Sequence, residues 1–178
     1  MLKLTALALG LVLLAAPVLA QSHGHQPYAE LKDRPIKALS AEDIANLRAG
    51  RGMGMALPAE LNRYPGPMHA LEHEQALALS AGQKQALTRQ MAEMRAAAAA
   101  LGERIIVREG ELEALFRSGL ADAVEVDRLT KEIGGLYGQL RAVHLRTHLW
   151  TRATLTEAQL AAYQAARGYD DAKPAHKH

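Results

Sequence analysis

Two long apolar seams, separated by a short turn at Ser118-Gly119, dominate this chain of 178 residues. In each seam most apolar side chains recur at alternating steps of three and four residues, which places them on one face of an α-helix. The pattern predicts two antiparallel helices, over about residues 81–117 and 123–153, joined as a hairpin. The seams comprise Leu87, Met91, Met94, Ala98, Leu101, Ile105, Leu112 and Leu115, and then Val126, Leu129, Ile133, Leu136, Leu140 and Val143.

The composition supports a helical fold. Hydrophobic residues make up 49% of the chain but aromatic residues only 4%, and most of the apolar residues are Ala and Leu. Ala and Leu favour helices, whereas strands need β-branched and aromatic residues. Because the chain has no Cys, it has no disulfide framework, thiolate metal site or cysteine nucleophile.

Other function classes are disfavoured by what the sequence does not contain. No nucleophile-elbow, P-loop or zinc-protease motif occurs, so we expect no enzymatic activity. The formal charge of +2 is too small to indicate nucleic-acid binding.

The N-terminus has the features of an export signal. Lys3 is followed by an apolar run over residues 4–16, then by Pro17 and a small-residue site that ends at Ala20. The run is shorter than the roughly 20 residues of a membrane-spanning helix. We therefore expect a signal peptide over residues 1–20, cleaved after Ala20, and a periplasmic protein with no stable membrane span. An uncleaved membrane anchor is the alternative.

Shorter elements flank the predicted hairpin. Over residues 21–66 we expect a polar arm, one short helix that begins after Ser40, and a flexible loop that carries Met53 and Met55. Residues 67–168 form the main helical domain, which opens with a short helix from about Pro67 to Ala78, and residues 169–178 form a disordered tail. Capping boxes predict helix starts at Ser80/Gln83, Asp122/Glu125 and Thr156/Gln159. Glycines predict helix ends at Gly119 and Gly168.

A hairpin this long cannot cover its own seams, so shorter helices or a second subunit must do so. We therefore predict an all-α fold, in which short helices flank the antiparallel hairpin in a four-helix, cradle-like homodimer. Gly134, Gly135 and Gly138 lie inside the second long helix. They mark either the close approach of a partner helix or a weak point of the helix.

Histidine is the residue type whose distribution most suggests chemistry. The eight histidines fall into four close pairs, His23/His25, His69/His73, His144/His148 and His176/His178. Residues four apart share one face of a helix, so the two middle pairs are each able to chelate a metal ion. In a four-helix bundle, the four side chains of these two pairs would be able to meet.

Several side chains are candidates to complete such a site, namely Glu72, Glu74 and Met68. Imidazole ligands without thiolate favour Ni, Co, Zn or Cu(II) over Mg or Ca. The alternative is that the helical histidines are solvated polar residues beside the seams. We expect the two terminal pairs to be solvated.

The methionines and arginines also have structural interpretations. Met91 and Met94 fit the first seam and are expected in the core, whereas Met53 and Met55 form a soft Cu(I) site, an apolar contact surface or only a connector. No Met lies near His148 in the sequence, where it would supply a thioether ligand. The arginines of the long helices, interleaved with glutamates, predict either a solvated ion-paired face or an amphipathic surface for unfolded chains.

Two short motifs carry a family resemblance. Leu79-Ser80-Ala81-Gly82-Gln83 and Leu155-Thr156-Glu157-Ala158-Gln159 resemble the paired LTxxQ motif of the Spy/CpxP superfamily of exported helical proteins. The second copy matches in full, and the first has Ser in place of Thr. The resemblance covers about residues 67–168 and implies a small, helical, cradle-like dimer. The superfamily includes ATP-independent periplasmic chaperones, envelope-stress regulators, the zinc-associated ZraP and the nickel/cobalt sensor CnrX.

The metal-sensing branch of that superfamily resembles this chain further. CnrX-like proteins bind metal through an early helical HxxxH pair and later helical ligands, a layout that His69/His73 and His144/His148 resemble, with Glu72 or Glu74 as the carboxylate. The resemblance implies a sensor or stress protein for a divalent transition metal. The alternatives are an ATP-independent chaperone for unfolded proteins and a regulatory partner, such as an inhibitor of a membrane-bound sensor kinase.

Overall fold

The computed structural model describes residues 28–169, and over these residues it contains helices and no strand. The chain divides into two compact units, residues 1–30 and 31–178. The expected signal peptide and the pairs His23/His25 and His176/His178 lie outside the described residues. A 3-10 helix, η1 (Ala29–Leu31), precedes α1 (Ala41–Arg48), α2 (Leu57–Glu60), α3 (Pro67–Glu72), α4 (Ala81–Arg117), α5 (Ala123–Thr154) and α6 (Glu157–Arg167).

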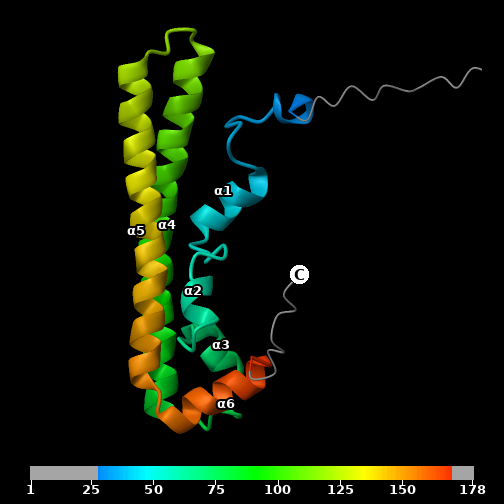
Figure 1. The fold of residues 1–178 in the computed structure, drawn as a ribbon, viewed down its shortest axis with the longest axis vertical. Coiled ribbons are helices and arrows are strands. Elements are labelled where there is room, and N and C mark those ends of the chain that lie inside the picture. Colours follow the sequence, from blue (N-terminus) through cyan, green and yellow to red (C-terminus); the bar gives the residue numbers. More distant parts are fainter. Residues whose placement is uncertain (1–27, 170–178) are drawn as a thin grey trace, which may run out of the picture. The chain divides into compact units, whose positions relative to one another are not determined.

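The predicted all-α fold with a long helical hairpin is confirmed (Figure 1). Helices α4 and α5 pack along each other, α1 and α3 pack on α4, and α2 and α3 also contact α5. Among the described residues, no helix is both long and apolar enough to cross a membrane. Helix α2 lies within the segment that the sequence predicts as a flexible loop.

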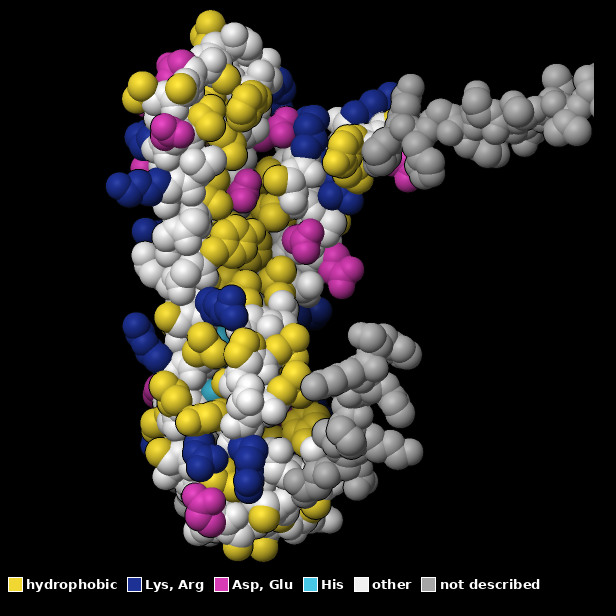
Figure 2. Space-filling model, viewed as in Figure 1, with side chains coloured by type: hydrophobic (Ala, Val, Ile, Leu, Met, Phe, Trp, Pro, Cys, Tyr) yellow, Lys and Arg dark blue, Asp and Glu magenta, His cyan; other side chains and the backbone are white. Residues whose placement is uncertain are grey.

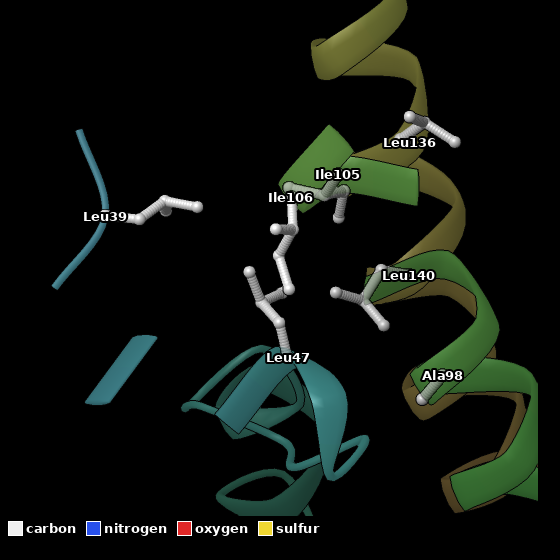
Figure 3. Packing of buried hydrophobic residues seen from close by; sticks show 7 residues of the cluster. All are labelled: Leu39, Leu47, Ala98, Ile105, Ile106, Leu136 and Leu140. Carbon is white, nitrogen blue, oxygen red and sulfur yellow. The ribbon is translucent and has the colours of Figure 1, made fainter. Parts of the chain in front are cut away.

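The first core cluster joins the hairpin to the segment before it (Figure 3). Leu136 and Leu140 come from the seam of α5, and Leu47 comes from α1. Leu39, from the segment that the sequence predicts as an arm, is also buried there, because Ile36 and Leu39 pack onto α4 and α5 rather than facing solvent. The cluster consists of Leu39, Leu47, Ala98, Ile105, Ile106, Leu136 and Leu140.

Close contact between α1 and α4 depends on a glycine that the seam pattern did not single out. A Cβ atom at Gly102 would lie 2.2 Å from the backbone oxygen of Leu47. No side chain fits in that space, so Gly102 allows the two backbones to touch. The three glycines inside α5 make no such close contact. A Cβ atom added at Gly134, Gly135 or Gly138 would have no neighbour within 4 Å.

The short helix predicted from Pro67 to Ala78 ends earlier, at Glu72, with His73 as its C-terminal cap. The chain then turns, with Ala78 at φ +46°, and the backbone N–H of Leu79 donates to the carbonyl of Glu74. The turn directs Leu77 and Leu79 inward. They join the second core cluster, which consists of Ala70, Leu77, Leu79, Leu87, Leu155, Leu160 and Tyr163.

The predicted helix ends are present. Ser80 with Gln83, and Thr156 with Gln159, form complete capping boxes. At Asp122 only half of the box is present, since its side chain accepts from the backbone of Glu125 without a reciprocal bond. The motif residues Leu79 and Leu155 are buried in the second core cluster. The two LTxxQ-like motifs therefore start helices and fill the core.

Candidate metal centre

A pocket of about 440 Å³ opens where five segments meet beside the hairpin. Its walls come from the loop over residues 50–54, from α2 and the start of α3, and from facing parts of α4 and α5. His69, His144 and His148 all line it, and we call it the imidazole pocket. Figure 2 shows small patches of histidine surface recessed among hydrophobic side chains, with basic side chains beside them.

The loop is held against α4 by its first residue. Gly50 has φ +60°, and a Cβ atom there would lie 2.5 Å from the backbone oxygen of Arg95. The chain then turns back through a hydrogen bond from the N–H of Met55 to the carbonyl of Gly52. This close approach places Gly52 against the ring of His144, whose Nδ1 would be 3.9 Å from an added Cβ.

His148 is oriented by the turn that precedes α3. Its Nδ1 lies 2.7 Å from the carbonyl oxygen of Tyr64 and 3.7 Å from Oε2 of Glu60. Because a carbonyl oxygen only accepts, Nδ1 donates the hydrogen, and Nε2 is the nitrogen through which a neutral ring would bind a metal. Metal-binding histidines are commonly oriented in this way, through the nitrogen that does not bind the metal.

His69 is oriented in a similar way by a carboxylate. Its Nδ1 lies 2.7 Å from Oε2 of Glu72, one turn along α3. That hydrogen bond is the main reason that the pKa of Glu72 lies below its ordinary value. The ionised carboxylate accepts the Nδ1 hydrogen, so Nε2 is the nitrogen through which a neutral His69 ring would bind a metal.

His144 is the third imidazole. It lies on the same face of α5 as the apolar seam, four residues after Leu140. It is 4% exposed, and its Nε2 is buried with no hydrogen-bond partner among the described residues. Burial is the main cause of a lowered pKa, with the neighbouring His148 second, so the ring is neutral at pH 7. Thr147 and Thr151, further along the seam, have satisfied hydroxyls because they donate to the carbonyls of Val143 and Thr147. An orphaned buried imidazole nitrogen is unusual and fits a ligand-binding role.

A buried carboxylate at the base of the pocket fixes the surrounding segments. Glu60 is 7% exposed, and its Oε2 accepts from the backbone N–H of Gly66 at 3.1 Å. Its Oε1 accepts from the hydroxyls of Tyr163 and Tyr169, and Nε of Arg167 lies 3.6 Å away. Burial and then the bond to Glu60 raise the pKa of Tyr163. Both oxygens of Glu60 already accept hydrogen bonds. Glu60 therefore holds the turn before α3, which orients His148, and does not offer a free carboxylate to a metal ion.

The structure separates the predicted ligands. His69, His144 and His148 line one pocket, whereas His73 and Glu72 are not part of its lining. His73 differs from His69 in position, because α3 ends at Glu72 and His73 is its C-terminal cap. The structure also brings methionines to the histidines that sequence distance did not suggest. The pocket is lined by Met53, Met68, Met91 and Met94, although none of them is near His148 in sequence.

The candidate ligands are not grouped around one point in this structure. Within residues 28–169, no three His, Asp or Glu side chains are grouped closely enough to hold one metal ion. Sequence reasoning also missed Glu60, since an acidic residue in a four-residue helix gives no sign that it is buried. Comparisons with family models, curated proteins and solved structures found no match to this chain.

Proposed function

We propose that this protein binds a transition-metal ion in the imidazole pocket and acts as a periplasmic metal sensor or metal-stress protein, without enzymatic activity. One observation carries the proposal. His69 comes from α3, and His144 and His148 come from α5, yet all three line a single pocket with a ring nitrogen that makes no described hydrogen bond. The resemblance to the Spy/CpxP superfamily agrees with this function.

The chemistry of these groups fits Ni, Co, Zn or Cu. Neutral imidazole supplies a lone pair to such metals. The orienting bonds to Tyr64 and Glu72 leave Nε2 free on two of the rings. The residues that would hold the ion are thus His69, His144 and His148, with Glu72 acting behind His69.

The same site offers a route to sensing. Because the three imidazoles are not grouped around one point, binding by all of them requires a rearrangement, which we propose is a shift of α3 relative to α5. A metal then selects the closed arrangement because it binds that arrangement better. We propose that this shift changes the contacts of the protein with a second copy of itself or with a membrane-bound regulator.

The test is calorimetric titration of the untagged protein with Ni, Co, Zn and Cu(II). We expect at least one metal to bind with a Kd below about 10 μM. His69→Ala and His144→Ala should weaken that binding by about tenfold or more. His73→Ala is the matched control, because it removes the other half of the same HxxxH pair but lies outside the pocket lining.

Two results would overturn the proposal. Either no metal binds more tightly than about 10 μM, or His73→Ala weakens binding as much as His69→Ala does. A variant in which His23, His25, His176 and His178 are all replaced by Ala separates capture by the terminal pairs from binding in the pocket.

A second candidate function is an ATP-independent chaperone for unfolded proteins. Large apolar side chains are exposed on the far half of the hairpin, with Val107 at 55%, Phe116 at 59%, Leu120 at 78% and Val124 at 75%. Exposed apolar surface of this kind is a feature of protein-binding faces. If this function holds, the protein slows aggregation of an unfolded client equally with and without a chelator, and Phe116→Ser together with Leu120→Ser abolishes the effect.

A further inference from the structure

Four methionine side chains line the imidazole pocket, and they come from three separate segments. Met53 lies in the loop, Met68 at the start of α3, and Met91 and Met94 on α4. The described chain contains one other methionine, Met55, which packs against the first core cluster instead. Four of the five methionines of the described residues therefore line the same pocket as the three histidines.

Core packing does not account for all of these side chains. Met53 is 39% exposed and Met68 is 42% exposed, so neither is a buried filler. Met53 also has a left-handed backbone, with φ +45°, a conformation that a side chain makes costly. Residues held in such conformations are commonly found at ligand-binding sites.

Met91 and Met94 are placed to act as a pair. Residues three apart share a helical face, and both side chains are partly buried at the wall of the pocket. Met94 also contacts the first core cluster, which restricts its movement. Met91 and Met94 therefore line the pocket from α4, and His144 and His148 line it from α5.

The charges around the pocket favour an ion of low charge. Both oxygens of Glu60 accept hydrogen bonds from other groups, and Arg167 lies beside them. Arg51 and Arg95 are exposed at the lining, and Nη2 of Arg95 lies 3.9 Å from Sδ of Met68. Two guanidinium groups repel a divalent cation twice as strongly as a monovalent one. The donors that remain are imidazole nitrogen and uncharged thioether sulfur.

We propose that the imidazole pocket takes copper as Cu(I), held by histidine nitrogen and at least one methionine sulfur. Soft thioether ligands select Cu(I), whereas Ni, Co and Zn gain little from them. The inference rests on the proposed function, because it names the ion for the same site. It assigns Met91 and Met94 as ligands and gives Met53 and Met68 the role of closing the pocket over the ion.

The test is a competition for Cu(I) between the intact protein and a chromophoric Cu(I) chelator, in anaerobic buffer with ascorbate. Zn and Ni are titrated in parallel by calorimetry. We expect Cu(I) to bind more tightly than Zn or Ni. Replacing both Met91 and Met94 by Leu should weaken Cu(I) binding by about tenfold or more and leave the affinity for Zn and Ni unchanged.

Two controls keep the result interpretable. Met55→Leu changes the one described methionine outside the lining and should leave Cu(I) binding intact. Leu has nearly the volume of Met, and thermal unfolding of each variant checks that the fold is preserved. X-ray absorption at the copper edge of the loaded protein should show sulfur scattering that the double variant lacks.

The outcomes separate the two proposals. If Zn or Ni binds more tightly than Cu(I), or if the double variant binds Cu(I) as well as the native protein does, the methionines are only an apolar lining. The copper inference then fails while the metal-binding function stands. If no metal binds at all, both fail.

Discussion

The side-chain amides of Gln83 and Gln159 donate to each other, with Nε2 to Oε1 distances of 2.9 and 3.0 Å across 76 positions of sequence. Each glutamine also closes its own capping box, because its Oε1 accepts from the backbone N–H of Ser80 or Thr156. Nε2 of Gln83 reaches the carbonyl of Thr154 as well. The first turns of α4 and α6 are thereby joined to each other and to the end of α5.

Removal of one amide should affect both helix starts. Gln159→Ala loses a cap bond and the cross-helix pair, so we expect the free energy of unfolding to fall by about 1–2 kcal/mol. Denaturant unfolding measures this change. A double-mutant cycle with Gln83→Ala should show coupling of about 0.5 kcal/mol or more, and Gln85→Ala, an exposed glutamine of α4, is the control. Additive losses would contradict the pairing.

Glu60 should be more important for stability than any exposed acidic residue. Glu60→Gln replaces a buried carboxylate that accepts from Gly66, Tyr163 and Tyr169, and we expect a loss of about 2–3 kcal/mol. Glu103→Gln, whose carboxylate is about half exposed, should change stability by less than about 0.5 kcal/mol. Thermal unfolding compares the two variants. Equal effects would show that Glu60 does not fix the turn before α3.

Two glycines should respond in opposite directions to the same substitution. Gly102→Ala forces a Cβ onto the backbone of Leu47, so we expect a loss of about 2 kcal/mol or more and displacement of α1. Gly135→Ala meets no atom within 4 Å and should stabilise α5 by about 0.5–1 kcal/mol. Chemical denaturation measures both. If Gly135→Ala instead converts a dimer to a monomer in a sedimentation experiment, a partner helix covers the face of α5 that carries Gly135.

Acid should weaken the start of α1. Asp43 accepts from the backbone and hydroxyl of Ser40, at 2.9 and 2.6 Å, and these bonds lower its pKa. A lowered pKa in the folded state contributes stability that is present above the unfolded value of about 3.9 and is lost as the pH falls through the folded value. Asp43→Asn should flatten the stability curve between about pH 5 and 2. An unchanged curve would contradict the assignment.

The parts of this fold that the sequence predicts are those that depend on residues close together in the chain. The seams fix the faces of α4 and α5, and the capping boxes at Ser80 and Thr156 fix helix starts within a residue, because both depend on neighbours in sequence. The early end of α3 was missed because it depends on where Leu77 and Leu79 find a core, which is a tertiary effect.

The site was predicted only in part for the same reason. The HxxxH spacing pointed to four histidines, of which His69, His144 and His148 line the imidazole pocket and His73 does not. The seam pattern placed Met91 and Met94 in the core, whereas they lie at its edge, where the loop over residues 50–54 leaves a pocket. Glu60 and Met53 acquire their positions from contacts with segments far away in sequence.

The most direct test of the metal site is anomalous diffraction from crystals of the protein loaded with its tightest-binding metal, recorded at the absorption edge of that metal. The account predicts a single strong peak bounded by His69, His144 and His148, with α3 drawn closer to α5 than in the metal-free protein. A peak at His73 or at the terminal histidines, with none in the imidazole pocket, would contradict it.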